Sequence, residues 1–130
     1  FGNDRTETNA VTIVISGNTP RAALAAEPQR RAAIDGTPAD LDGDASRHLV
    51  PWMSENWRSR FSWRGEGTIP AQDLARLGDL VRRAHTQGRR VRFWGGPDIE
   101  SLWRVQHAAG VDFINTDKLA QLRSFLLQTP

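Results

Sequence analysis

The feature that most constrains this chain is the alternation of β-prone runs with helical segments along its second half. Strands that alternate with helices pair in parallel, because each helix carries the chain back across the sheet in a right-handed crossover. The pattern therefore predicts an α/β fold. It places helices at residues 70–87, 98–110 and 116–127, and strands at residues 90–94 and 111–115.

Helix 70–87 has the clearest signal of the three. Leu74, Leu77, Val81 and Ala84 recur at spacings of three and four residues, which gives the helix one apolar face. A proline at its start and a glycine after its end are typical helix boundaries.

The two later helices have candidate N-caps and candidate core residues. Asp98 and Thr116 are the caps, since a side-chain oxygen at such a position accepts a bond from a free backbone N–H. Trp103 lies in the middle of its helix and is expected in the core. Leu119, Leu122 and Leu126 are expected to point inward from the last helix.

The first half of the chain is less regular. Residues 10–16 are almost continuously β-branched and apolar, which is typical of a parallel strand buried on both faces. Residues 48–53 form a weaker strand candidate, because Pro51 removes a ladder donor. The other predictions are a short helix at 20–27, a strand at 31–35, a polar loop at 36–48 and a long functional loop at 54–69.

Five predicted strands suit two architectures. They could form a small doubly wound sheet, or the second part of a (β/α)8 barrel, whose usual length is about 250 residues. In either case, functional groups belong at the carboxyl ends of the strands. The chain begins with Phe1 rather than Met, and we expect residues 1–130 to be a single partial domain cut from a longer chain.

Composition excludes several classes of function. The chain has no cysteine, which removes disulfides, zinc–thiolate sites and thiol catalysis. The formal net charge is +2 and is uneven, with −3 on residues 1–45 and +5 on residues 46–130. This distribution favours an anionic ligand but is weak evidence for nucleic acid. No apolar run approaches the ~18–20 residues of a membrane span, and no signal-peptide pattern is visible, which leaves the compartment open.

Polar or aromatic side chains beside small residues follow each predicted strand. A ligand-binding rim needs this combination of an aromatic wall, hydrogen-bonding groups and backbone that a ligand can approach. Each residue alone also has a structural explanation, as a turn residue, a helix cap or a favourable charge in a first helical turn. The candidate substrate-binding residues are Asn18, Asp35, Asn56, Trp57, Trp94, Asp98, Asn115 and Asp117.

The sequence contains no complete catalytic machinery. His48, His85 and His107 are scattered, and no pair of them has metal-ligand spacing. Neither a P-loop nor a G-x-S-x-G elbow is present. The residues therefore predict a ligand-binding cleft without a catalytic residue or a metal ligand of its own.

Four stretches carry a resemblance to a known superfamily: "VRFWGGPD", "GVDFINTDKLAQLRSFL", "VISGN" and "SENWRSRFSWRGEG". They resemble the carboxyl-terminal part of the phosphatidylinositol-specific phospholipase C-like phosphodiesterases. Within that superfamily the sequence is most similar to bacterial relatives of altered inheritance of mitochondria protein 6, and glycerophosphodiester phosphodiesterases are more distant members.

The resemblance implies a (β/α)8 barrel in which residues 10–127 form strands four to eight. It implies a metal-dependent phosphoric diester hydrolase for glycerophosphodiester or phosphoinositide-like substrates. Two histidines and the acidic ligands of a divalent cation, Mg or Ca, would lie in preceding strands. This chain would supply the wall of the substrate pocket, because Trp94 matches a pocket-facing tryptophan after strand seven and Thr116-Asp117 match a Thr-Asp pair after strand eight.

Two other functions stay open from the residues alone. A binding module for phosphate-bearing lipid or nucleic acid would use the arginines and the five tryptophans without catalysis. A barrel without catalytic residues would have only a structural role. For the isolated chain we expect open edge strands at residues 11–16 and 111–115, aggregation or marginal stability, and no activity. Any export signal would precede this chain.

Overall fold

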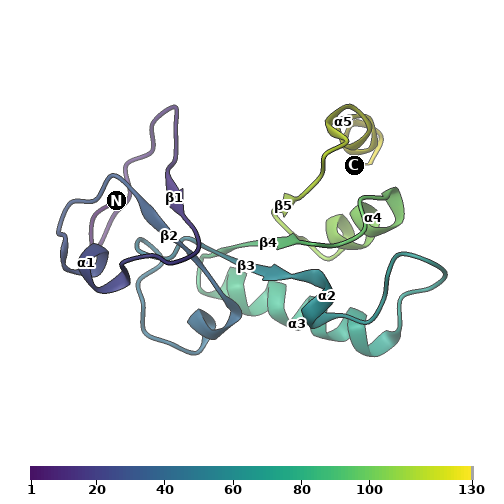
Figure 1. Ribbon diagram of the computed structural model, residues 1–130, viewed down its shortest axis with the longest axis horizontal. Coiled ribbons are helices and arrows are strands. Elements are labelled where there is room, and N and C mark those ends of the chain that lie inside the picture. Colours follow the sequence, from purple (N-terminus) through teal and green to yellow (C-terminus); the bar gives the residue numbers. More distant parts are fainter. Residues whose placement is uncertain (130) are drawn as a thin grey trace.

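The computed structural model describes residues 1–129 and has one sheet of five parallel strands with helices between them (Figure 1). The strands are β1 (Val14–Ile15), β2 (Ala33–Gly36), β3 (Trp52–Asn56), β4 (Arg90–Trp94) and β5 (Phe113–Ile114). The helices are α1 (Arg21–Ala26), α2 (Trp57–Arg60), α3 (Ala71–Thr86), α4 (Glu100–Ala108) and α5 (Leu119–Gln128), and η1 (Pro38–Leu41) is a 3-10 helix.

The order of the strands in the sheet is their order in the chain, and every neighbouring pair is parallel. A doubly wound sheet reverses its order at a switch point, and the sheet within residues 1–129 shows no reversal. Winding in one direction is the topology of (β/α)8 barrels. The fold is therefore α/β and compatible with part of such a barrel, with β1 and β5 as the two edges of the sheet.

The main core lies between the sheet and α3, which runs along β3 and β4 in Figure 1. Met53 of β3 and Val91 and Phe93 of β4 belong to the same buried cluster as Leu77 and Val81 of α3. The strand residues follow the alternation of a β-strand, and the helix residues follow helical spacing. The side chains of the sheet and of α3 therefore pack into one apolar layer.

Residues that follow β3 extend this core with aromatic rings. Trp57 is completely buried, and its ring centroid lies 4.3 Å from that of Phe61 and 5.4 Å from that of Phe93. Its indole N–H donates to the carbonyl oxygen of Trp63 at 2.9 Å. The predicted loop 54–69 therefore contains the end of β3, helix α2 and part of the core.

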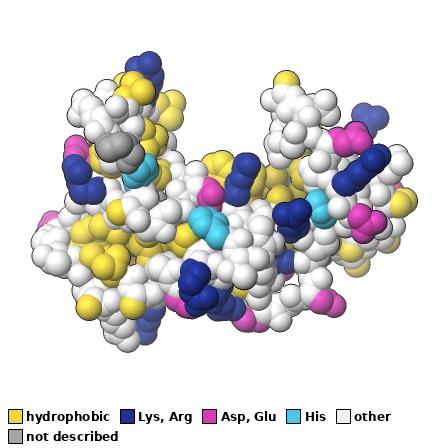
Figure 2. Space-filling view, turned by 180° about the vertical axis from the view of Figure 1, so that it is seen from behind, with side chains coloured by type: hydrophobic (Ala, Val, Ile, Leu, Met, Phe, Trp, Pro, Cys, Tyr) yellow, Lys and Arg dark blue, Asp and Glu magenta, His cyan; other side chains and the backbone are white. Residues whose placement is uncertain are grey.

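The other face of β3 and β4 carries polar and aromatic side chains. Strand alternation and the sheet register put Trp52, Ser54, Arg90 and Arg92 on this face. The ring of Trp52 meets that of Phe113 on β5, with centroids 5.0 Å apart. Figure 2, seen from behind, shows the molecule hollowed between two arms, one formed by the amino-terminal region and the other by α5.

The first predicted strand is much shorter than expected. β1 contains two residues of the predicted 10–16, and the side chains of Val11 and Ile13 are exposed. The strand pairs with one neighbour only, and α1 buries none of its residues against it. A strand is buried on both faces only when other elements pack over both faces. Since α1 does not pack over β1, the strand is not doubly buried as its composition predicts.

The third strand begins four residues later than predicted. The predicted range 48–53 contains Pro51, and the strand starts directly after it, at Trp52. Proline has no N–H for the ladder, so it marks the beginning of the strand rather than its interior. Trp52 therefore stands at the amino-terminal end of β3.

β4 coincides with its predicted bounds, and the remaining elements are present with ends shifted by one to three residues. Leu77, Val81 and Ala84 of α3 are buried as predicted, but in its first turn Asp73 is buried whereas Leu74 is 47% exposed. In α5, Leu122 is buried as predicted and packs with Phe125 against Trp103, whereas Leu119 and Leu126 are exposed, contrary to the prediction. Trp103 is a core residue, as predicted. None of the helices within residues 1–129 has the length and apolar character needed to cross a membrane.

Candidate functional site

Five of the eight candidate residues gather where β3, β4 and β5 end. Asn56 and Trp94, the last residues of β3 and β4, are partners in the sheet register. Asp98 follows β4, and Asn115 and Asp117 follow β5, which is the next strand of the sheet. Parallel strands bring these segments to one edge, as the barrel-like arrangement requires.

Trp94 is the exposed aromatic side chain at this edge. It is 45% exposed, and the chain turns away directly after it at Gly95, whose φ of +69° lies in the left-handed region. A Cβ on Gly95 would stand 2.8 Å from Oδ1 of Asn56. Arg58 Nε donates to the carbonyl oxygen of Gly95 at 2.9 Å, which fixes the turn. The glycine thus ends the strand and leaves the Trp94 indole accessible to a ligand.

Asp98 ties the segment after β4 to the segment after β5. Its Oδ1 accepts from Thr116 Oγ1 at 2.7 Å and from Trp103 Nε1 at 3.1 Å, and its Oδ2 accepts from the Asp117 N–H at 2.9 Å. Lys118 Nζ donates to the Asp98 carbonyl oxygen at 2.6 Å. One carboxylate therefore joins two rim segments and a core tryptophan.

Neither Asp98 nor Thr116 caps a helix, so both capping predictions were wrong. The N-cap residues are Ile99 for α4 and Lys118 for α5, and neither makes a side-chain cap bond. Thr116 Oγ1 does accept from the Lys118 N–H at 2.8 Å, before α5 begins. The Asp98 carboxylate is instead turned toward donors from α4 and from the segment between β5 and α5.

The environment of Asp98 fixes its charge. Burial raises the pKa of this carboxyl, but hydrogen bonds from Thr116, the Asp117 N–H and Trp103, together with the charge of Lys118, outweigh burial and lower the pKa below its ordinary value of 3.8. Asp98 is therefore ionised at neutral pH. It acts as a fixed negative charge at the rim and not as a proton donor.

A pocket of about 190 Å³ opens between the segments after β4 and β5 and the sheet-facing side of α4. We name it the strand-end pocket. Gly95 and Gly96 bring bare backbone to it, and Gln106 of α4 contributes a buried amide. Its lining includes Gly95, Gly96, Asp98, Gln106, Asn115 and Asp117.

Two arginines of β4 lie on the sheet face that leads to this edge, Arg90 at the amino-terminal end of the strand and Arg92 in its middle. Arg92 Nη2 donates to Oδ1 of Asn115 at 2.7 Å, and the Arg90 guanidinium lies 5.6 Å over the ring of Phe113. Neither arginine forms an ion pair with a carboxylate of the described chain. This face therefore carries uncompensated positive charge beside an acidic rim.

Three candidate residues lie apart from this group. Asn18 is exposed in the loop after β1. Asp35 is level with Trp52 at the start of β3, and its Oδ1 accepts from Trp52 Nε1 at 2.9 Å. Trp57 is completely buried in the aromatic core, so we leave it out of the proposed site.

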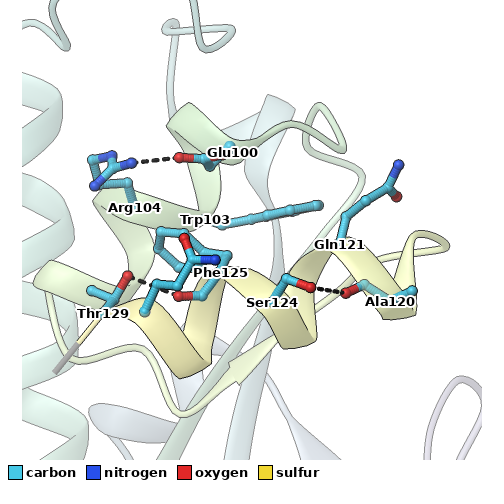
Figure 3. Close-up of a pocket in the computed structure, with 9 residues that line it drawn as sticks. Glu100, Trp103, Arg104, Ala120, Gln121, Ser124, Phe125 and Thr129 are labelled. Atoms are coloured by element: carbon cyan, nitrogen blue, oxygen red, sulfur yellow. Dashed lines mark hydrogen bonds and ion pairs between the residues drawn. The ribbon is translucent and has the colours of Figure 1, made fainter.

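A larger cavity, of about 520 Å³, lies between α4 and α5 (Figure 3). Trp103 and Phe125 form its apolar wall, and the Arg104 guanidinium stands 5.5 Å over the Phe125 ring while pairing with Glu100. None of the eight candidate residues lines this cavity. We therefore place the candidate site at the strand ends and not between the helices.

The described residues do not fit a divalent cation. Within residues 1–129, no three His, Asp or Glu side chains come together as metal ligands. His85 pairs with Asp112 at 2.9 Å and His48 with Thr6 at 2.9 Å, and no histidine lines the strand-end pocket. No chemical step through a metal can be assigned to these side chains.

Comparisons with known proteins support a relation to the superfamily. Residues 90–120 match the glycerophosphoryl diester phosphodiesterase family. Altered inheritance of mitochondria protein 6 of Lachancea thermotolerans is 30% identical over 63 residues, which cover 44% of this chain and 15% of that protein. The protein of the same name from Eremothecium gossypii is 39% identical over 54 residues, 38% of this chain and 14% of that protein. The matches thus span a small part of these relatives' length. No solved structure matches the chain.

Sequence reasoning missed Gln106 as a member of the pocket. The residue lies four positions after Leu102 and three after Trp103, on the apolar stripe of α4, and it is buried with them. A polar residue at an apolar position of a helix is the signal that could have identified it.

Proposed function

We propose that this chain is part of a phosphoric diester hydrolase that acts on glycerophosphodiester or phosphoinositide-like substrates, and that it supplies a wall of the substrate pocket. The proposal rests on the overlap between the family match and the candidate site. The family match at residues 90–120 covers β4, α4 and β5 together with Trp94, Asp98, Asn115 and Asp117, the residues that gather at the strand ends. At the family level this match indicates a phosphodiesterase-type function.

Each rim group has a task that its chemistry suits. The exposed Trp94 indole offers a flat apolar surface to the carbon skeleton of a substrate. Asn115 and Asp117 offer hydrogen bonds to hydroxyl groups. Asp98 holds the two rim segments in register through its three donors. In this proposal the general acid, the general base and the ligands of a divalent cation, Mg or Ca, come from residues outside these 130.

The test uses the longer protein that contains this chain, with Mg or Ca added and a panel of glycerophosphodiesters and phosphoinositides. We expect hydrolysis, and we expect Trp94→Ala to raise KM about tenfold or more with a smaller change in kcat, because it removes binding surface. Leu127→Ala, an exposed apolar residue of α5, is the control and should change neither constant. Absence of cleavage across the panel would refute the activity, and an unchanged KM in Trp94→Ala would remove Trp94 from the pocket.

A second function has one observation in its favour. Arg90 and Arg92 lack carboxylate partners in the described chain and share a sheet face with Trp52 and Phe113, a combination that suits phosphate binding with base stacking. Binding of single-stranded nucleic acid by the chain that weakens steeply with salt would favour a non-catalytic module. No binding at low salt would end this alternative for nucleic acid.

A further inference from the structure

The floor of the strand-end pocket carries an unsatisfied polar group. Gln106 is 3% exposed, and its side-chain oxygen Oε1 is buried without a hydrogen-bond partner. A buried acceptor without a partner lowers the stability of a fold. Because the residue lines the pocket, a group that enters the pocket can reach this amide.

The charges around the pocket decide which kind of group would be accepted. Two acidic residues, Asp98 and Asp117, line it, and no lysine or arginine does. Asp98 carries its negative charge at neutral pH for the reasons given above. Many (β/α)8 enzymes bind phosphate at the loops that follow their last two strands. Here the lining of the pocket supplies two carboxylates and no cationic side chain, while Lys118 and Arg92 contact Asp98 and Asn115 from outside the lining. Oε1 of Gln106 is the acceptor without a partner in this lining, so it is the atom that an incoming donor would satisfy.

The dimensions of the pocket fit a small group. Its volume of about 190 Å³ is many times the ~15 Å³ that one water needs. Gly96 belongs to the wall, and a Cβ there would stand 2.6 Å from Cδ2 of Leu102, so the backbone at this position must stay bare. The space therefore admits a substituent of a few heavy atoms and brings it against main chain on one side and Gln106 on the other.

We propose that the strand-end pocket binds a hydrogen-bond donor group of the substrate, a polyol hydroxyl or an ammonium group, and excludes the phosphate. The donor pairs with Oε1 of Gln106, and the acidic rim favours it electrostatically. This assignment rests on the proposed function only in treating the donor as part of a phosphodiester. The phosphate would then lie outside the pocket, where Arg92 bonds to Asn115.

The experiment is a titration of the 130-residue chain with three separate probes: glycerol, ethanolamine and inorganic phosphate. Two-dimensional NMR follows the side-chain amide of Gln106 and the backbone amides of Gly95 and Gly96. We expect saturable shifts with glycerol or ethanolamine and none with phosphate. The arm that saturates at lower concentration shows whether the donor is a hydroxyl or an ammonium group.

Gln106→Met tests the assigned contact, because it keeps the length of the side chain and removes its polar atoms. Binding of the preferred probe should weaken about tenfold, while the thermal midpoint should stay equal or rise, since the unpaired acceptor is gone. Gln72→Met, on the exposed side of α3, is the control and should leave binding unchanged. A merely structural glutamine would instead lower the thermal midpoint when replaced.

Several outcomes would overturn the proposal. Saturable shifts with phosphate at these amides would refute the electrostatic argument, and no shifts with any probe would mean that the pocket holds only water. The titration of the unsubstituted chain decides between these even if Gln106→Met does not fold. Because the titration needs no catalysis, its failure leaves the phosphodiesterase proposal standing, and a failure of hydrolysis in the longer protein leaves the pocket assignment standing.

Discussion

The amino-terminal region (residues 1–32) and the carboxyl-terminal region (residues 52–128) are held together by different forces. In the amino-terminal region, α1 buries no residue and β1 has two residues, both only partly buried. Polar contacts hold it instead, with Arg30 at their centre. The Arg30 side chain donates to the Gly2 carbonyl oxygen at 2.7 Å and to the Glu27 carbonyl oxygen at 2.9 Å.

The carboxyl-terminal region is held by apolar packing. The main buried cluster contains residues of β3, α2, α3, β4 and α4 and begins in sequence at Leu41. No residue of 1–32 belongs to it. Apolar burial contributes about 1.5–3 kcal/mol for each large side chain, whereas a hydrogen bond contributes a net of about 0.5–1.5 kcal/mol. The comparison therefore indicates a cooperative carboxyl-terminal unit with a weakly attached amino-terminal segment.

The largest test of this comparison is removal of a core ring from the carboxyl-terminal region. We expect Trp57→Ala to lower the free energy of unfolding by about 3–5 kcal/mol, because a completely buried side chain leaves a cavity. Urea denaturation followed by far-UV circular dichroism measures the change. Trp94→Ala is the matched control, since that tryptophan is exposed and should cost well under ~1 kcal/mol. Equal losses in both variants would contradict the assignment of Trp57 to the core.

A smaller effect is expected at Asp73, the buried carboxylate of α3. Its Oδ2 accepts from the Ser62 N–H and Oγ at 2.9 Å each and from the Trp63 N–H at 3.0 Å. We expect Asp73→Asn to cost about 1–3 kcal/mol, because it weakens the acceptor for three donors. Asp79→Asn, an exposed residue of the same helix, should be close to neutral in the same denaturation experiment.

Asp73 also predicts how stability depends on pH. Burial raises the pKa of its carboxyl, but the bonds from Trp63 and Ser62 and the charge of Arg76 lower it below the ordinary 3.8. A depressed folded pKa gives stability that is complete above the unfolded pKa and is lost as the pH falls through the folded pKa. Denaturation should therefore show a plateau above about pH 5 and a decline below about pH 4 that is flatter in Asp73→Asn. An equal decline of stability with falling pH in the unsubstituted chain and in Asp73→Asn would contradict the contribution of Asp73.

Local sequence patterns predicted most of the fold, because strand and helix periodicities are set by near neighbours. β4 and α3 illustrate this, because the apolar face of each is buried against the other in the main core. β1 illustrates the limit, because whether an apolar run becomes a strand depends on what packs over it. The first turn of α3 shows the same limit. Its Asp73 carboxylate is buried where donors at residues 62 and 63, in the loop that precedes the helix, reach it.

The candidate site could be predicted only in part for a related reason. The end of β4 was identified correctly at Trp94, and Asp98, Asn115 and Asp117 lie together in the lining of the strand-end pocket, of which Trp94 is not part. The partners of Asp98 could not be predicted, since they come from two other segments, α4 and residues 116–118. Gln106 was missed because its role depends on the space above it and not on its neighbours in the chain.

The smallest expected change in global stability is at Arg30, and it tests the amino-terminal side of the comparison directly. Its side chain is 6% exposed, so Arg30→Met keeps the buried aliphatic part and removes the guanidinium that bonds to Gly2 and Glu27. We expect the free energy of global unfolding to change by less than ~0.5 kcal/mol, because the main core contains no residue of 1–32. Hydrogen exchange should nevertheless accelerate at two backbone amides. The N–H of Gly2 donates to the Arg5 carbonyl oxygen, and the N–H of residue 30 donates to the Phe1 carbonyl oxygen.

The neighbouring Arg31 gives the matched control for this experiment. It is exposed, so Arg31→Met makes the same change of charge and should alter neither the exchange rates nor the unfolding free energy. Faster exchange in Arg30→Met alone would show that one guanidinium holds the segments within residues 1–32 together. If Arg30→Met instead lowered global stability as much as Trp57→Ala, the two regions would form one cooperative unit, since loss of a polar contact in one would then unfold the apolar core of the other.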